Sequence, residues 1–238
     1  MKYFNLLLLI PIIGFSQEKF KVEYERRYFT KIEGNSDYHR AMEEQFSKPV
    51  YIELKGNNNQ CSLKEIERID NSQGQHYKMQ VIGGYKDLES YLDFTTNKEI
   101  VSREMEGKLY LVDTEIKPLD WIIARETKKI KGYQVKKATL VKDNMNYEAW
   151  FSTEIKSKCG PGEVFGLPGL VLEFTRTVID KPTSYATFKL ENITLDNSVK
   201  FLVPTKGKQM SGEEFNQFEE EYNKKMQERI QNISVNKD

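Results

Sequence analysis

Apolar and polar residues alternate along most of the chain, which is typical of strands that bury one face. Phe20, Val22 and Tyr24 alternate with charged residues, and the same period of two recurs over residues 50–54 and in several later segments. Clusters of Gly, Asn and Ser separate these segments at short intervals, as in a meander rather than in a βαβ repeat. The pattern predicts a mainly β fold built on a curved antiparallel meander sheet.

Two segments depart from this rhythm and carry helical spacing. Residues 36–46 place apolar side chains four apart, so a short helix is expected after the first strand. Residues 211–230 begin with Ser211 and Glu214 in the spacing of a capping box, which predicts a C-terminal amphipathic helix. The apolar face of this helix consists of Phe215, Phe218, Tyr222, Met226 and Ile230. We expect that face to pack on the sheet; the alternative is a helix that binds a partner.

The N-terminal residues have the features of a secretory signal peptide. A single Lys precedes an apolar run from Tyr3 to Phe15, and small or polar residues follow. The run is shorter than the roughly 20 residues that span a membrane, and the sequence contains no second long apolar stretch. We therefore expect cleavage after Ser16, with residues 1–16 removed and residues 17–238 forming a single β-rich domain. Because no Cys lies at the cleavage site, a soluble product is expected rather than a lipoprotein.

The charge balance argues against nucleic acid as a partner. The chain has 36 Lys and Arg and 36 Asp and Glu, which gives a formal net charge of zero. A protein that binds nucleic acid or an anionic membrane through its overall field carries a clear excess of basic residues. The short basic clusters lie among carboxylates and are interpreted as solvated surface.

The sequence offers few groups for catalysis or metal binding. Its histidines are His39 and His76, and neither forms a spaced metal motif with another ligand. Cys61 and Cys159, in an exported chain, could form a disulfide or remain as two thiols, and the residues alone leave both open. We expect no metal, no cofactor and no catalytic constellation.

A glycine-rich stretch, CGPGEVFGLPGLVLEF, occupies residues 159–174. Residues 160–163 and 167–170 each place Pro second and Gly third, the signature of a type II turn in which glycine takes a positive φ. The stretch lacks the spacing and Lys of a phosphate-binding loop. It is interpreted as two turns that lead into a strand beginning at Leu170, with Pro168 before the strand.

The segment before this stretch, residues 147–153, also alternates. Its period of two places Trp150 on the polar side of a strand, opposite Phe151. A Trp on such a face either covers a sheet edge or lines a cleft with its N–H available. Trp121 is a second candidate for the same cleft.

These segments together resemble the GLPGLI family of secreted envelope proteins of bacteria with two membranes. The resemblance covers residues 118–175. Val171 and Val135 depart from the family pattern, and the departure at Val135 leaves the disulfide assignment open. The resemblance implies a candidate site, structural or binding, formed by the residues of the family motif: Trp150, Phe151, Gly160, Pro161, Gly166, Leu167, Pro168, Gly169 and Leu170. The family has no established reaction, and some members are associated with outer-membrane transporters. The layout also resembles the open barrel of periplasmic lipoprotein carriers, a likeness of fold alone.

The resulting hypothesis is a periplasmic, non-enzymatic protein that binds a hydrophobic small molecule or lipid in a cleft near Trp121 or Trp150. One alternative is an accessory or structural protein that partners an outer-membrane transporter. Another is a cysteine-dependent enzyme, for which Cys159 would be the nucleophile.

Overall fold

The computed structural model describes residues 18–68 and 86–235. In these ranges the elements in chain order are β1 (Phe20–Phe29), α1 (Asp37–Phe46), β2 (Val50–Gly56), β3 (Gln60–Ile66), β4 (Lys86–Asp93), β5 (Lys98–Met105), β6 (Lys108–Glu115), β7 (Ile122–Ile130), β8 (Tyr133–Lys142), β9 (Met145–Ser152), β10 (Leu170–Val178), β11 (Tyr185–Leu195), β12 (Lys208–Ser211) and α2 (Gly212–Val235). The expected signal peptide at residues 1–16, and His76, lie outside the described residues.

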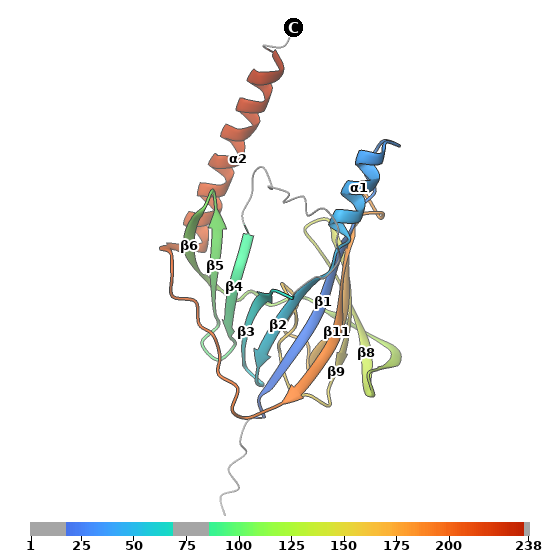
Figure 1. The fold of residues 1–238 in the computed structure, drawn as a ribbon. Coiled ribbons are helices and arrows are strands. Elements are labelled where there is room, and N and C mark those ends of the chain that lie inside the picture. The colour runs from blue at the N-terminus through green and yellow to red at the C-terminus, as the bar shows by residue number, and fades with distance from the viewer. Residues whose placement is uncertain (1–17, 69–85, 236–238) are drawn as a thin grey trace, which may run out of the picture.

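The strands form one open, curved sheet in the order β12-β6-β5-β4-β3-β2-β1-β11-β10-β9-β8-β7 (Figure 1). Two meanders, β1 to β6 and β7 to β11, are joined where β1 pairs with β11. The mainly β fold with a helix after the first strand and a C-terminal helix is confirmed. One pair is parallel, between the short β12 and β6, so the sheet is mixed.

The hydrophobic core covers one face of this sheet, which we call the inner face. On β1 the side chains of Phe20, Val22 and Tyr24 are fully buried, whereas the residues between them are charged. Residues paired directly across neighbouring strands share a face, so Ile52 of β2 and Leu190 of β11 continue the same layer. Each fully buried apolar side chain of this size contributes roughly 1.5–3 kcal/mol. The alternation in the sequence thus defines the inner and outer faces.

The connection between β9 and β10, residues 153–169, folds back against the inner face, and we call it the inner loop. It is held by main-chain hydrogen bonds from Gly166 N to Lys158 O (2.7 Å) and from Leu170 N to Ile155 O (3.1 Å). The loop contributes buried side chains to the core, namely Ile155, Cys159, Val164 and Leu167. The glycine-rich stretch is therefore part of the core, and it fills space that an apolar ligand would otherwise need.

Two glycines of the inner loop show how far the turn prediction holds. Gly162 has a φ of 62°, as a type II turn over residues 160–163 requires. Gly169 does not adopt a positive φ, so the turn predicted over residues 167–170 is wrong. Gly169 is needed for a different reason, because a Cβ at this position would lie 2.1 Å from the carbonyl oxygen of Ser152. The requirement is close packing of two backbone segments.

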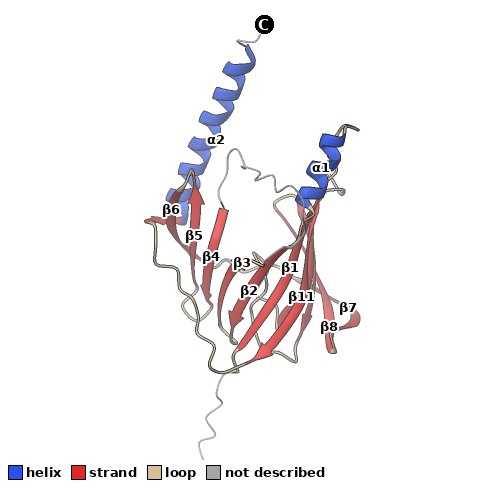
Figure 2. Cartoon of the chain, in the orientation of Figure 1, coloured by secondary structure: helices blue, strands red, loops and turns tan. Residues whose placement is uncertain are grey.

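The two helices rise from the same end of the sheet and stand apart from each other (Figures 1 and 2). Ser36 caps α1 by accepting a hydrogen bond from His39 N, and α1 buries no residue fully. The predicted capping box of α2 is present, since Ser211 N donates to Glu214 Oε2 (2.7 Å) and Glu214 N donates to Ser211 Oγ (3.2 Å).

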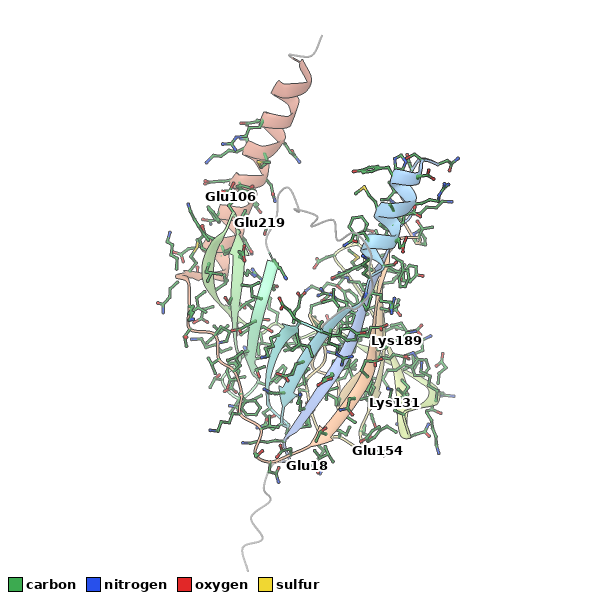
Figure 3. The ribbon with its side chains drawn as sticks, in the orientation of Figure 1. Glu18, Glu106, Lys131, Glu154, Lys189 and Glu219 are labelled. Carbon is green, nitrogen blue, oxygen red and sulfur yellow. A yellow bond between two sulfur atoms is a disulfide. The ribbon has the colours of Figure 1, made fainter. Side chains whose placement is uncertain are left out.

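The first turns of α2 cover the β5–β6 end of the inner face. Phe215 is fully buried against Tyr110, and Phe218 and Tyr222 pack on the same cluster, so the expected packing on the sheet is confirmed for these three residues of the apolar face. Figure 3 shows Glu106, at the turn between β5 and β6, next to this part of the helix. Beyond it the helix extends away from the sheet (Figure 1). Within the described residues, no helix combines the length and apolar character needed to cross a membrane.

Candidate functional site

The residues singled out by sequence are mainly structural. Leu167 and Leu170 are fully buried, and Gly160 approaches Val164 so closely that a Cβ would lie 2.3 Å from its carbonyl oxygen. Phe151, directly before the inner loop, is also buried in the core. These side chains offer no surface to a ligand.

Trp121 anchors the inner loop. Its indole Nε1 donates to the carbonyl oxygen of Phe165 (2.9 Å), and its ring packs partly buried against the core. The hollow beside it, shared with Tyr147 and Glu163, has a volume of only about 10 Å³. Such a space holds at most about one water molecule. The expected apolar cleft is therefore not formed by the described residues around Trp121.

Trp150 lies on the outer face, away from Trp121. The Nζ of Lys128 lies 4.3 Å from the centroid of the Trp150 ring, and Nε1 donates to Glu148 (3.1 Å). Lys137 pairs with the same Glu148 (2.7 Å). Surrounded by charged groups from three strands, Trp150 covers the surface near the sheet edge and does not line a cleft.

Cys61 and Cys159 form a disulfide across a sequence separation of 98 residues. Hydrogen bonds reinforce this link, because Ser157 Oγ donates to Asn57 O (3.0 Å) and Lys158 N donates to Asn58 O (3.1 Å). The disulfide thus joins the inner loop to the start of β3 beside the β2–β3 turn. With both cysteines bonded and buried, the structure has no free thiol to act as a nucleophile.

Toward the end of the sheet that carries the helices, the inner face changes from apolar to charged. On β1 the inward stripe of apolar residues continues with Arg26, which pairs across the sheet with the core residue Phe188. On β10 the corresponding stripe continues with Arg176, which pairs with the core residues Ala186 and Tyr147. Both arginines therefore point to the same side as the core.

Five charged residues from separate parts of the chain meet here, and we call them the inner cluster: Asp87, Glu99, Arg103, Glu163 and Arg176. Asp87 Oδ1 accepts a hydrogen bond from Arg103 Nε (2.7 Å) between β4 and β5. Glu163, from the inner loop, forms an ion pair with Arg176 of β10. The inner loop therefore supplies one of the charges of the cluster as well as part of the core.

The charges of the inner cluster lie close enough to act on one another. Burial raises the pKa of Asp87, the nearby Glu163 raises it further, and Arg103 opposes the shift. Burial likewise raises the pKa of Glu99, which is opposed by the hydrogen bond from Thr114 and by Arg103. Yet the side chain of Asp87 keeps 49% of its accessible surface. The carboxylate is thus reached by solvent, although protein atoms surround part of it.

The two arms of the curved sheet approach each other at this cluster. Lys142 of β8 lowers the pKa of Glu99 of β5, although burial prevails, and Glu163 acts on Asp87. Burial also raises the pKa of Tyr147, which faces Arg176. The sheet order separates β8 from β5 by seven strands, so this proximity comes from curvature.

A second group of charges lies alongside. Arg26 NH2 donates to Glu65 Oε1 (2.6 Å), and Lys86 Nζ lies 2.9 Å from Glu65 Oε2. Burial alone would raise the pKa of Glu65. The hydrogen bonds and positive charges of Lys86 and Arg26 have the larger effect and hold the pKa of Glu65 below its usual value. The side chain of Tyr28 lies near Arg26, whose guanidinium carbon is 5.1 Å from the ring centroid.

The inner face carries both donors and acceptors of hydrogen bonds. No group of three His, Cys, Asp or Glu side chains within residues 18–68 and 86–235 could hold a metal ion. The carboxylates can accept and the guanidinium groups can donate several hydrogen bonds in fixed planes. Sequence reasoning missed these residues, although Arg26 and Arg176 carried a signal, as charges at inward positions of apolar stripes.

Comparison with known proteins gives one family match and a set of similar structures. The model of a family described as "N-glycanase peptide, N-terminal domain" matches residues 107–201. A search of curated proteins finds no match. The structure of PNGF-II in space group C2 aligns with a TM-score of 0.54 and 15% identity, over 84% of this chain and 32% of that one. The P21 form gives a TM-score of 0.53 and 17% identity, over 85% and 33%.

These matches correct the resemblance drawn from the sequence. The expected membership of the GLPGLI family is wrong, because the matching family model is that of the N-glycanase N-terminal domain and the similar structures are those of PNGF-II. The chain spans about a third of the length of those solved chains. At this level of identity, the similarity establishes a shared fold.

Proposed function

We propose that this protein is an exported, non-catalytic binding module that holds a polar ligand of the oligosaccharide class at the inner cluster. The observation that carries the proposal is the meeting of Asp87, Glu99, Arg103, Glu163 and Arg176 on the concave side of the sheet. Neighbouring hydroxyl groups of a sugar donate and accept hydrogen bonds, and paired carboxylates and guanidinium groups match both roles.

The inner cluster favours such a ligand because it is held in place before binding. Arg103 and Arg176 are each fixed by a carboxylate, and both lie on strands rather than on mobile loops. Fixed groups lose little conformational entropy when a ligand binds. The hydrophobic ligand expected from the sequence has less support, since the inner loop fills the apolar part of the face.

The family comparison suggests which oligosaccharide to test first. The matching model is named for an N-glycanase, and the matched residues 107–201 include Glu163, Arg176 and Tyr147. An N-glycan is therefore the natural first ligand. The proposal concerns binding by this chain, and the cysteine-dependent alternative loses its support because Cys61 and Cys159 are joined in the disulfide.

A second candidate function uses α2. Where α2 leaves the sheet, its half-buried Phe218, Tyr222 and Met226 line a hollow of about 210 Å³ together with Glu106 and Arg229. An accessory module could dock a partner protein along this helix. The outer-membrane transporter was expected as a partner because of the resemblance to the GLPGLI family, which proved wrong. No other observation identifies the partner.

Isothermal titration calorimetry separates the polar ligand from the hydrophobic one. The purified protein is titrated with an asialo biantennary N-glycan and, in parallel, with palmitate. Saturable binding of the glycan with no heat from palmitate supports the proposal. Binding of palmitate alone contradicts it and restores the hydrophobic ligand.

A further inference from the structure

Arg26 lies beside the inner cluster with one side of its guanidinium group uncommitted. Its side chain retains 18% of its accessible surface, and it projects from the inner face of β1. Among the described residues, its Nε is a buried side-chain nitrogen with no hydrogen-bond partner. A buried donor without an acceptor is destabilising, so its presence needs a reason.

The reason lies in how Glu65 is shared. A carboxylate that faces an arginine alone can accept from two nitrogens of the guanidinium group at once. Here Oε1 of Glu65 accepts from Arg26 NH2, while Oε2 lies 2.9 Å from Lys86 Nζ. Glu65 therefore serves two cations with one oxygen each, and Nε of Arg26 receives none.

Within the trio of Arg26, Lys86 and Glu65, the positive charges outnumber the negative one. Arg26 and Lys86 carry two positive charges against the single negative charge of Glu65. Lys86 is 60% exposed, so the ammonium group is open to solvent. Tyr28 connects the site to the inner cluster, since it acts electrostatically on Arg176. An anionic group bound at Lys86 and at the accessible part of the Arg26 guanidinium would balance this charge.

We propose that Arg26 and Lys86 form a subsite for an acidic group of the bound ligand, either a carboxylate, a sulfate or a phosphate. This inference rests on the proposed function for its oligosaccharide, which would be an acidic glycan. The subsite itself is a property of these two residues and can be tested with an inorganic anion. The same anion chemistry could come from a free ion or from an acidic sugar, and the experiment distinguishes the two.

The first measurement uses sulfate alone. Thermal unfolding of the wild type, Arg26→Lys, Lys86→Gln and the outer-face control Lys55→Gln is followed in increasing sodium sulfate, with sodium chloride at equal ionic strength as reference. Sulfate stabilises most proteins by exclusion, so the relevant quantity is the difference between variants. We expect a saturable additional rise in Tm for the wild type and Lys55→Gln that both other variants lack. Equal rises in all four proteins would overturn the subsite.

Lys86→Gln protects the test against a folding defect, because Lys86 is largely exposed and Glu65 keeps Arg26 as its partner. Arg26→Lys retains the positive charge but lacks the planar guanidinium group. If Arg26→Lys does not fold, the outcome is decided by Lys86→Gln. An unchanged sulfate response in that variant counts against the proposal.

The second measurement compares a sialylated biantennary N-glycan with its asialo form. The wild type is expected to bind the sialylated glycan about tenfold more tightly, as one additional charge-assisted contact would give. Lys86→Gln is expected to lose this preference while it binds the asialo glycan as before. Equal affinities of the wild type for both glycans would refute the acidic ligand. If neither glycan binds but the sulfate response depends on Lys86, the proposed function fails and the anion subsite stands.

Discussion

Gly169 and Ser152 lie so close that a Cβ on Gly169 would be 2.1 Å from the carbonyl oxygen of Ser152. This contact fixes the end of the inner loop against the end of β9, where β10 begins. Neither backbone segment can move without displacing the strands, and so the position accepts only glycine.

Gly169→Ala is therefore expected to destabilise the protein by about 2–3 kcal/mol, the upper part of the range for overpacked sites. Gly107→Ala is the matched control, because Gly107 has a φ of 72° but a Cβ at this position would have no atom within 4 Å. That change should cost only about 1 kcal/mol from backbone strain. Urea denaturation measures both, and a smaller loss for Gly169→Ala than for Gly107→Ala would contradict the close-contact account.

The disulfide between Cys61 and Cys159 should contribute strongly to stability. It closes a long loop, with a sequence separation of 98 residues, and holds the inner loop in the core. Replacing both cysteines by alanine is expected to lower the free energy of unfolding by about 2–5 kcal/mol. Denaturation with and without reductant checks this expectation. Reductant should shift the midpoint of the wild type and leave the double variant unchanged; a shift in both would show that it acts elsewhere.

The two tryptophans should differ when each is changed to phenylalanine. Trp121→Phe removes the hydrogen bond to Phe165 O that anchors the inner loop, and should cost about 1–2 kcal/mol. Trp150→Phe removes a hydrogen bond to Glu148 on the outer face, where water can replace it. The urea midpoint of Trp150→Phe should therefore differ less from that of the wild type than the midpoint of Trp121→Phe does. If Trp150→Phe proved the more damaging change, the assignment of Trp121 as the anchor would be wrong.

Asp87 and Glu65 should give opposite pH dependence. The folded state raises the pKa of Asp87, so its contribution to stability is present at acidic pH and is lost as the pH rises through the folded pKa. The folded state lowers the pKa of Glu65, whose contribution is present above the unfolded pKa and is lost as the pH falls.

Stability curves for Asp87→Asn and Glu65→Gln from about pH 3 to about pH 8 test these signs. Relative to the wild type, Asp87→Asn should gain stability as the pH rises from about 4 toward neutral, taking the usual carboxyl pKa as the starting point. Glu65→Gln should lose stability relative to the wild type as the pH rises from about 3 to the usual carboxyl pKa, and should change little relative to it above that pH. Parallel curves for the two variants would show that the inner cluster does not perturb Asp87.

The sequence predicted those features that depend on neighbouring residues. Ser211 and Glu214 cap α2 because both partners lie within one turn, and Phe20, Val22 and Tyr24 face inward because the strand period is two. Gly169 was assigned the wrong role, since its partner Ser152 lies across a loop of 17 residues that the sequence does not fold.

The inner cluster could not be predicted from the sequence for the same reason. Asp87 lies far in sequence from Glu163 and Arg176, and each of the three resembles ordinary surface charge in its own segment. Only the curvature of the sheet and the folding back of the inner loop bring them together. The parallel pairing of β12 with β6 was likewise invisible, because four residues carry too little pattern.

The most direct test of the binding site compares two glutamates of β10 and its preceding loop. Glu163 pairs with Arg176 on the inner face, whereas Glu173 pairs with Lys128 (2.5 Å) on the outer face. The affinity for an asialo biantennary N-glycan is measured by calorimetry for the wild type, Glu163→Gln and Glu173→Gln. We predict that Glu163→Gln weakens binding about tenfold, the value of one charge-assisted hydrogen bond, and that Glu173→Gln leaves it unchanged. Equal affinities for all three proteins, or a loss confined to Glu173→Gln, would contradict a ligand site on the inner face.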